Sequence, residues 1–573
     1  MNPTLKRRRA LVAASLSFFV LLTAVFAAPA FFTQKRGNAR QQKNANTATT
    51  KKQPAALETK ATKKDARTPP PSPAPKPDAP ATTQEAREAD AALGREITRL
   101  IEEGDFAQAR WGVSVVSLRD GRVVYARDAR RLFTPASNMK LFATAAALDL
   151  LGADYRWRTS VYAAAGPDAQ GTIAGDLVLY GRGAPDLSSR VRKGAPEAHL
   201  SRLAEELKRR GVRRVRGGVV GDESYFRGET LGDGWQWNDV QWYYGAEVSA
   251  LSIDDNEITL TLAPADKEGE QAKVRLTPPS DYVRVTNDMN MVKRGERSTI
   301  GITRTPDSNE VRVWGDFPSG ASPYGVRLSV HRPALWAARL FRDALRARGI
   351  EVEGEARLRD ARTRRETKEF DVEQSVELAS VSSRPLVEVV RETNKKSLNL
   401  QAELLLRTIG AELGDKLAPL PDPQRARQRN ADTAGLAVIG RWLKERAGVE
   451  AGELAMHDGS GLSRLNLVTP ESFTRLLAWM AQTPSAGAFR ASLPNRDGTL
   501  EYRLRNAGAA AERIHAKTGT LTYINSLSGY ADTAGGEPLA FSIICNDETG
   551  RDSSVRILDA IAALIASHPD AKR

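Results

Sequence analysis

Residues 134–148 carry the pattern that decides the fold class: Thr134-Pro135-Ala136-Ser137-Asn138-Met139-Lys140, followed by Leu141-Phe142-Ala143-Thr144-Ala145-Ala146-Ala147-Leu148. The run after Lys140 is apolar and rich in alanine, which predicts a helix that begins near Ser137 and is buried on most sides. Residues i and i+3 share a helix face, so the amine of Lys140 can reach the hydroxyl of Ser137. A lysine buried in this way is costly unless it is paired or used.

A serine hydroxyl becomes a good nucleophile only when a base takes its proton. A partly desolvated lysine with a lowered pKa can be that base. Ser137-x-x-Lys140, which occurs once in the chain, therefore indicates a serine nucleophile with a lysine base. The alternative is structural: Ser137 caps the helix and the amine of Lys140 reaches solvent.

Two further motifs follow in the second half of the chain. Lys517-Thr518-Gly519-Thr520 lies on a predicted strand, where Gly519 is expected to leave room for a substrate along the strand edge. Ser397-x-Asn399 lies just before a predicted helix. Each motif is weak alone, but the three together, in this order, match the signature of serine enzymes that interact with penicillin.

The composition excludes several other classes of protein. The net charge is +14, but residues 1–64 hold 13 Lys or Arg and a single acid, Glu58, so the rest is nearly neutral. A nucleic-acid-binding protein is therefore not expected. The one cysteine, Cys545, excludes an intrachain disulfide and a cysteine-ligated metal cluster. The five histidines are scattered and form no His-Glu-x-x-His pattern, so we expect no catalytic metal. Acyl transfer on a serine also implies no organic cofactor.

The N-terminus has the pattern of an export signal. Lys6–Arg9 are basic and precede an uncharged, mostly apolar stretch over residues 10–34. Residues 1–34 are therefore predicted to be a signal peptide or a signal anchor, with the rest of the chain exported to a periplasmic or extracytoplasmic location. Cleavage and retention as a membrane anchor (residues 10–34) both stay open. Residues 35–87, basic and then proline-rich, are predicted to be a disordered linker.

The remaining chain is predicted to have an α/β (α+β) fold, an antiparallel sheet flanked by helices. Its first part, residues 88–158, contains a helical pattern over 88–103 and a hairpin over 111–126. Its second part, residues 366–573, ends with three predicted strands near 512–518, 524–531 and 538–545 and a helix over 552–566. Residues 159–365 are predicted to form one or two inserted, mostly β domains, with helices near 197–210 and 332–348.

Additional segments make the pattern more specific: Gly234–Asp239, Tyr243–Leu251, Asp458–Arg464, Ser492–Pro494 and Asp497–Leu500. With the three motifs, the sequence resembles the class C low-molecular-mass penicillin-binding proteins, the D-alanyl-D-alanine carboxypeptidase/endopeptidase family, over residues 100–570. The long segment between Lys140 and Ser397 fits that family, which inserts extra domains there. Two departures are Leu398, where a polar residue is common, and Ala184, where the family usually has Asp.

The resemblance implies a penicillin-binding transpeptidase-like (serine β-lactamase-like) catalytic domain and a role for each matching residue. Ser137 would be the acylated nucleophile and Lys140 its base. Ser397 would relay a proton to the leaving amine, and Asn399 would bind the substrate amide. The terminal carboxylate would bind Lys517 and Thr518, and the backbone N–H groups of Ser137 and Thr520 would form the oxyanion hole. The pocket for the substrate side chain would be lined by Asp239, Tyr244 and Arg464.

The implied function is hydrolysis of peptidoglycan stem peptides through an acyl-enzyme, with β-lactams as inhibitors. Three alternatives remain at this point: a β-lactamase, a transpeptidase, and a catalytically weak wall-binding scaffold. Within the chain, His457-Asp458 near Ser460 suggests a second serine site, but adjacent residues rarely converge on one serine, so we expect a loop that lines the cleft. The aromatic residues over 235–244 are expected to pack an inserted loop rather than to stack on sugars.

Overall fold

The computed structural model describes residues 84–190, 198–265, 270–360, 370–422, 425, 429–549 and 553–569, all within one compact unit, Pro77–Arg573. The predicted signal or anchor (1–34) and the linker up to residue 83 lie outside the described residues. Helix α1 spans Gln84–Glu102, so it begins inside the predicted linker. Among the described helices, none has the length and apolarity needed to cross a membrane.

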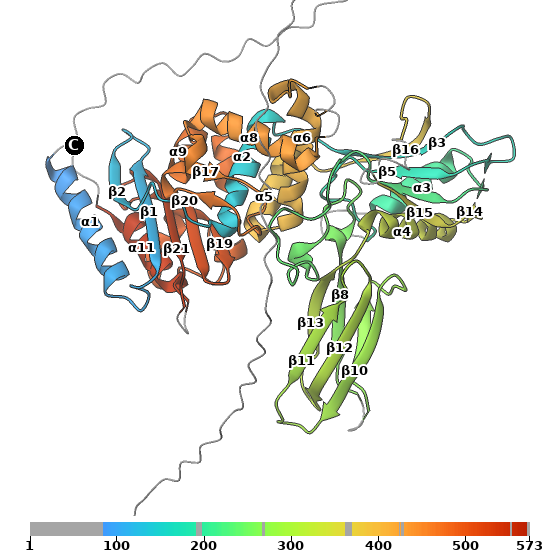
Figure 1. Ribbon diagram of the computed structural model, residues 1–573, viewed down its shortest axis with the longest axis horizontal. Helices are drawn as coiled ribbons and strands as arrows, with labels where there is room; N and C mark the ends of the chain where they lie inside the picture. The colour runs from blue at the N-terminus through green and yellow to red at the C-terminus, as the bar shows by residue number, and fades with distance from the viewer. Residues whose placement is uncertain are drawn as a thin grey trace, which may run out of the picture. The chain divides into compact units, whose positions relative to one another are not determined.

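A five-stranded antiparallel sheet organises the catalytic part, in the order β19-β20-β21-β1-β2 (Figure 1). Its strands are β1 (Arg110–Ser117), β2 (Val123–Arg127), β19 (Ile514–Leu521), β20 (Ile524–Asp532) and β21 (Pro538–Asn546). Helices α1 and α11 (Val555–Ser567) pack together on this sheet and form one apolar core with it. The other core contains α9 (Pro470–Met480), α2 (Lys140–Leu150) and the opposite face of the sheet. The predicted antiparallel sheet flanked by helices is confirmed.

The helical layer over the second core begins with the stretch that decides the fold class. A short 3₁₀ helix, η1 (Ala136–Met139), leads directly into α2, and every residue from Lys140 to Leu148 is buried. This agrees with the apolar pattern, which left no polar face. The neighbouring helices are α5 (Leu386–Lys396), α6 (Asn399–Leu417), α8 (Ala431–Ala447) and α10 (Ala486–Ser492).

The inserted part is built from several small sheets. The larger sheet has the order β15-β7-β5-β3-β16 and packs against α3 (His199–Arg209) and α4 (Pro333–Ala347), close to the predicted helices. Its strands are β3 (Arg158–Ala163), β5 (Leu177–Tyr180), β7 (Val219–Asp222), β15 (Ala356–Arg359) and β16 (Val376–Ser382). Since β16 pairs with β3, the chain of this sheet extends to Ser382, beyond the predicted boundary at residue 365.

The other sheets of the inserted part each have three strands. One has the order β10-β12-β11, with β10 (Arg284–Val292), β11 (Thr299–Arg304) and β12 (Glu310–Pro318). Another has the order β13-β8-β9, with β8 (Glu257–Ala263), β9 (Lys273–Thr277) and β13 (Tyr324–Ser329). The last is β14-β6-β4, with β4 (Thr172–Ile173), β6 (Arg214–Val215) and β14 (Glu351–Val352). The sheet that contains β8 and β13 supplies residues to the site described next.

Candidate active site

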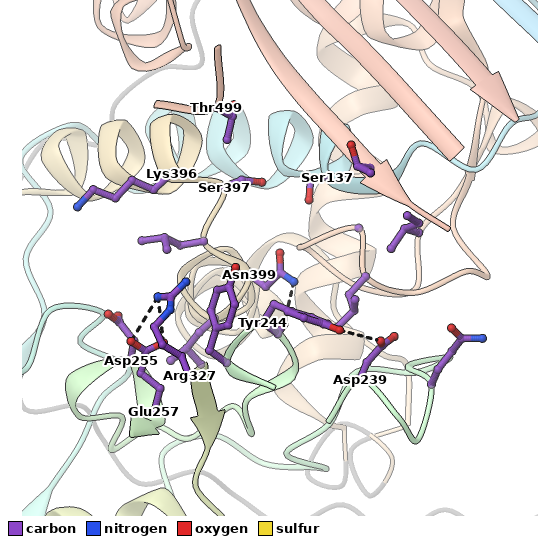
Figure 2. A pocket seen from close by; sticks show the side chains of 18 of the residues that line it. Ser137, Asp239, Tyr244, Asp255, Glu257, Arg327, Lys396, Ser397, Asn399 and Thr499 are labelled. Atoms are coloured by element: carbon purple, nitrogen blue, oxygen red, sulfur yellow. Dashed lines mark hydrogen bonds and ion pairs between the residues drawn. The ribbon is translucent and has the colours of Figure 1, made fainter. Parts of the chain in front are cut away.

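Ser137 lies on η1, in a turn held against the edge strand β19 (Figure 2). Ala136, just before it, has a φ of 50°, and the hydroxyl of Ser526 donates to the carbonyl of Pro135 at 2.7 Å. A Cβ on Gly519 would lie 2.8 Å from the Pro135 carbonyl oxygen and 3.0 Å from the Ser137 nitrogen. The missing side chain of Gly519 therefore leaves room for the turn that carries Ser137. Room for a substrate along the strand edge stays a prediction.

Lys140 lies below Ser137 and is fully buried, which rules out the structural alternative of an amine in solvent. Its Nζ donates to Ser137 Oγ at 2.9 Å, to Asn399 Oδ1 at 2.6 Å and to the Ser460 carbonyl at 2.5 Å. Burial lowers the pKa of Lys140 to about 7, although the negative charges of Asp458 and Glu403 act to raise it. The amine is therefore within reach of the hydroxyl and close to the pKa that suits a base at neutral pH.

The short connection between α5 and α6 carries both Ser397 and Asn399 and places them in the site. Ser397 has a φ of 56° and ends α5, while Asn399 is the first residue of α6. The amide nitrogen of Asn399 donates to the Tyr244 carbonyl at 2.8 Å, and its oxygen accepts from Lys140. Asn399 thus connects the catalytic helices to the inserted loop that contains Tyr244. These two hydrogen bonds fix the orientation of the Asn399 side chain.

Lys517 reaches the site from β19 and is also fully buried. Its Nζ donates to Ser397 Oγ at 2.9 Å and to the Thr518 carbonyl at 2.7 Å. Burial, with the nearby charge of Lys140, lowers the pKa of Lys517 well below its ordinary value. The hydroxyl of Thr518 donates to Thr499 Oγ1 at 2.8 Å. Thr499 therefore also belongs to the site, although the sequence singled it out only as part of the segment Asp497–Leu500.

A cleft of about 820 Å³ opens above these groups. Ser137, Ser397 and Asn399 line its middle (Figure 2), and Thr520 is also part of its lining. Lys140 and Lys517 are fully buried. The three sequence motifs, far apart in the chain, therefore meet along one cleft.

Asp239, Tyr244 and Arg464 all line the same cleft. The hydroxyl of Tyr244 donates to Asp239 Oδ1 at 3.3 Å, and Arg464 donates to the Thr522 carbonyl at 3.2 Å. Burial raises the pKa of Asp239, with the Tyr244 hydroxyl and the Arg464 charge acting against it, and it raises the pKa of Tyr244 to about 12. This part of the cleft presents a carboxyl and a guanidinium to a ligand.

Two buried carboxylates fix the backbone behind Lys140: Glu403, which no sequence motif singled out, and Asp458, which was considered only beside His457 and as part of a family segment. Glu403 Oε1 accepts from the backbone N–H groups of Gly459 and Ser460, at 2.9 and 2.8 Å, and its Oε2 accepts from Arg407 at 2.7 Å. Asp458 accepts from the Ser460 hydroxyl at 2.8 Å, among several donors of its own loop. These contacts direct the Ser460 carbonyl at Lys140. The available signal was a Glu and an Arg four residues apart inside an otherwise apolar helical stretch.

The other candidate residues have structural partners. His457 Nδ1 contacts Asp233 at 2.8 Å rather than Asp458, and Ser460 is fully buried, so no second serine triad forms there. Trp235 donates to Asp458 at 2.9 Å, and Trp242 packs on the inserted core, as expected for a packed loop. Trp237 differs, because it is 83% exposed. No cluster of three or more metal-ligating side chains occurs among the described residues.

A serine beside a buried lysine, with a second buried lysine on the edge strand of an antiparallel sheet, is typical of the penicillin-recognising serine enzymes. Comparison with known proteins narrows this class: the model of the D-Ala-D-Ala carboxypeptidase 3 (S13) family matches residues 93–568, and the chain belongs to this family. The chain is therefore a serine peptidase, and its resemblance to the low-molecular-mass penicillin-binding proteins is confirmed.

Two relatives illustrate the similarity. The D-alanyl-D-alanine carboxypeptidase of an Actinomadura species is 35% identical over 492 residues, which cover 83% of this chain and 85% of that protein. The crystal structure of penicillin binding protein 4 from Haemophilus influenzae superposes with a TM-score of 0.68 at 25% identity, covering 82% of this chain and 97% of that one. A second structure of that protein, in complex with a β-lactam, has a TM-score of 0.63 at 22% identity, covering 82% of this chain and 98% of that one.

Proposed function

We propose that the chain hydrolyses the D-Ala-D-Ala bond of peptidoglycan stem peptides and that Ser137 carries the acyl group. The observation that supports this most strongly is the 2.9 Å separation of Lys140 Nζ and Ser137 Oγ, with the lysine fully buried. Neutral Lys140 takes the hydroxyl proton as Ser137 Oγ attacks the carbonyl carbon of the penultimate D-alanine. The C–N bond breaks, D-alanine leaves with a proton delivered through Ser397, and water then hydrolyses the ester on Ser137.

The remaining residues of the cleft would each bind a different part of the substrate. Lys517 and Thr518 would bind the terminal carboxylate, with Ser397 between that lysine and the leaving nitrogen. Backbone N–H groups of Ser137 and Thr520 would bind the developing oxyanion, beside Gly519. On the acyl side, Asn399 would bind the substrate amide, and Asp239, Tyr244 and Arg464 would bind the substrate side chain. A β-lactam would acylate Ser137 and remain there.

This function also assigns a place to the N-terminal segment. Peptidoglycan stem peptides lie outside the cytoplasmic membrane, so residues 1–34 would serve as the export signal, or would anchor the chain to the membrane through residues 10–34 if uncleaved. The linker from residue 35 to the start of α1 would then separate the enzyme from the membrane surface.

Release of D-alanine from a synthetic stem pentapeptide tests the proposed reaction. We expect the wild-type chain to release D-alanine and Ser137→Ala to release none above background. Turnover of a chromogenic β-lactam faster than D-alanine release would favour a β-lactamase. Transfer of the acyl group to an added acceptor amine, in preference to water, would favour a transpeptidase. A folded chain with none of these activities would favour the wall-binding scaffold.

The pH dependence of acylation should follow Lys140. Because burial lowers the pKa of Lys140 to about 7, the neutral amine that acts as base predominates above that pH. We expect the rate of acylation by a β-lactam to rise with pH through about 7 and to level off above it. Stopped-flow measurement between pH 5 and 9 tests this, and a rate that is flat through neutrality would contradict the base role.

The variant Glu403→Gln distinguishes the effect of the Glu403 charge on Lys140 from the effect of the Glu403 hydrogen bonds that position the backbone behind Lys140. Burial, with the nearby charge of Asp458, raises the pKa of Glu403 to about 7, so its negative charge is present mainly above that pH. The amide keeps an oxygen that can accept from Gly459 and Ser460, but this charge, which raises the pKa of Lys140, is lost. We therefore expect the rising limb of the pH profile to move to lower pH. A purely structural role would lower the rate and leave the limb in place.

A further inference from the structure

Three exposed apolar side chains lie beside the end of the cleft that contains Asp239, which we call the acyl end (Figure 2). They are Trp237, Leu465 and Tyr523, whose exposed fractions are 83%, 46% and 59%, and we call this group the aromatic rim. Each of them is next in sequence to a residue that lines the cleft. Tryptophan is highly buried on average, and apolar side chains that gather on a surface often mark an interaction site. The reaction described above gives the aromatic rim no role.

The aromatic rim is built from three segments that are distant in the sequence. Gly234, at the start of the loop over residues 234–239, approaches Leu465 so closely that a Cβ on the glycine would lie 2.7 Å from Leu465 Cγ. On the other side of this contact, Arg464 Nη1 donates to the Thr522 carbonyl at 3.2 Å, in the turn between β19 and β20. The three exposed side chains therefore extend from segments that contact one another.

The loop that carries Trp237 is held in place from the inside. Trp235 Nε1 donates to the buried carboxylate of Asp458 at 2.9 Å. The backbone N–H of Asp239 donates to the Gln236 carbonyl at 2.9 Å, which closes a turn around Trp237. Trp237 is thus exposed on a structured loop, so the backbone beneath its ring needs little further ordering when a ligand binds.

The neighbours of Trp237 suit a ligand that is polar at its edge and apolar on its face. Gln236 and Asn238 are both exposed and line the cleft, and a side-chain amide can donate and accept hydrogen bonds. A sugar ring has this combination, because its C–H groups form a face that packs on an indole, while its edge carries hydroxyl and acetamido groups. The acyl chain of a lipid would use the indole but not the amides.

The proposed function places a sugar on this side of the cleft. It puts the D-Ala-D-Ala end of the stem peptide at Ser137 and the preceding side chain at Asp239. A stem peptide is joined to an amino sugar of the glycan strand at its amino end, so the substrate continues past Asp239 toward that sugar. Two extended residues span about 7 Å, and the same limit applies to the separation of Trp237 from Asp239 along the chain.

We infer that the aromatic rim binds the amino sugar to which the acyl-side stem peptide is attached, and that Trp237 stacks on the sugar ring. This rests on the proposed function. Gln236 and Asn238 bind the hydroxyl and acetamido groups of the sugar, and Leu465 and Tyr523 cover its outer edge. The chain thereby prefers stem peptides that are attached to a glycan strand over free stem peptides.

Kinetics on two substrates test the inference with the full-length chain. We compare D-alanine release from a synthetic stem pentapeptide with release from the same pentapeptide joined to the disaccharide unit of the glycan strand. Each preparation is normalised to the fraction acylated by labelled penicillin. The wild-type chain should have about tenfold higher kcat/KM for the glycosylated substrate, the scale of one aromatic contact. In Trp237→Ala this ratio should fall to about one, and the loss should lie in KM, because the sugar contacts are the same in the ground and transition states.

Two further variants distinguish stacking on Trp237 from a general effect of losing an exposed ring. Trp237→Phe keeps an aromatic face and should keep most of the preference for the glycosylated substrate. Trp314→Ala is the matched control, because Trp314 is also an exposed tryptophan, at 41%, but lies on β12, in a sheet that supplies no residue to the cleft. This control should leave the ratio unchanged.

Several results would overturn the inference alone: equal kcat/KM for the two substrates in the wild-type chain, an unchanged ratio in Trp237→Ala, or an equal fall in Trp314→Ala. Sedimentation of the wild-type chain as a dimer that Trp237→Ala dissociates would assign the aromatic rim to a second copy and would also overturn it. A wild-type chain that releases D-alanine from neither substrate would overturn the proposed function as well.

Discussion

Replacing Lys140 by methionine will lower the rate of acylation of Ser137 by about a thousandfold, the scale expected for loss of a general base. The amine is 2.9 Å from Ser137 Oγ, and no other amine among the described residues donates to that hydroxyl. Methionine has a similar length and no charge, so it fills the buried space below Ser137. Binding of labelled penicillin over time gives the rate directly.

The fold should survive this change. The substitution leaves Asn399 Oδ1 and the Ser460 carbonyl without their donor, at a cost of about 1–3 kcal/mol each, but it also removes an amine whose burial disfavours its charge. Thermal unfolding of Lys140→Met, compared with Lys444→Met at the exposed ion pair with Glu450, checks the fold. Acylation within tenfold of the wild-type rate, in a folded Lys140→Met chain, would contradict the role of Lys140 as the base.

Gly519→Ala will inactivate the enzyme by displacing the nucleophile, although it removes no reactive group. The added methyl carbon would lie 2.2 Å from Ser526 Oγ, 2.8 Å from the Pro135 carbonyl oxygen and 3.0 Å from the Ser137 nitrogen. Two of these atoms are backbone, so β19 and the Ser137 turn must separate. A displacement of about 1 Å at a reacting group can cost about a hundredfold in rate, and we expect at least that loss of kcat/KM.

Stability should fall in the same variant by about 1–3 kcal/mol, because the extra methyl overpacks a buried contact. Gly440→Ala is the control, since a Cβ at that helical position meets nothing within 4 Å. D-alanine release and urea unfolding on both variants test the two parts together. A Gly519→Ala chain with wild-type activity would show that the turn and β19 do not need their close contact.

The parts of the fold that could be predicted are those that depend on the spacing of residues close together in the sequence. Lys140 could be placed beside Ser137 because their spacing fixes them on one helix face, and the apolar run that follows indicated its burial. The strands near 512–545 alternate with turn residues and could be located, which the structure confirms. The pairing of β1 with β21 joins residues more than four hundred positions apart, and no local pattern records it.

The parts that could not be predicted depend on contacts between distant segments. The pairing of β16 with β3 adds an edge strand to the inserted sheet, so this sheet includes residues beyond 365, up to Ser382, which no local pattern indicates. The buried Glu403 had no visible role until the loop with Gly459 and Ser460 lay against it. Gly519 was predicted to leave room for a substrate, and the close approach of the Ser137 turn to this glycine became visible only in the structure.

The central claim is that Ser137 is the nucleophile, and mapping a penicillin adduct tests it most directly. The full-length chain and its Ser137→Ala variant would be incubated with labelled penicillin, digested and analysed by mass spectrometry. We predict a stable adduct on the peptide that contains Ser137, and none in the variant. An adduct on another serine, or no adduct on a chain shown to be folded, would contradict the account.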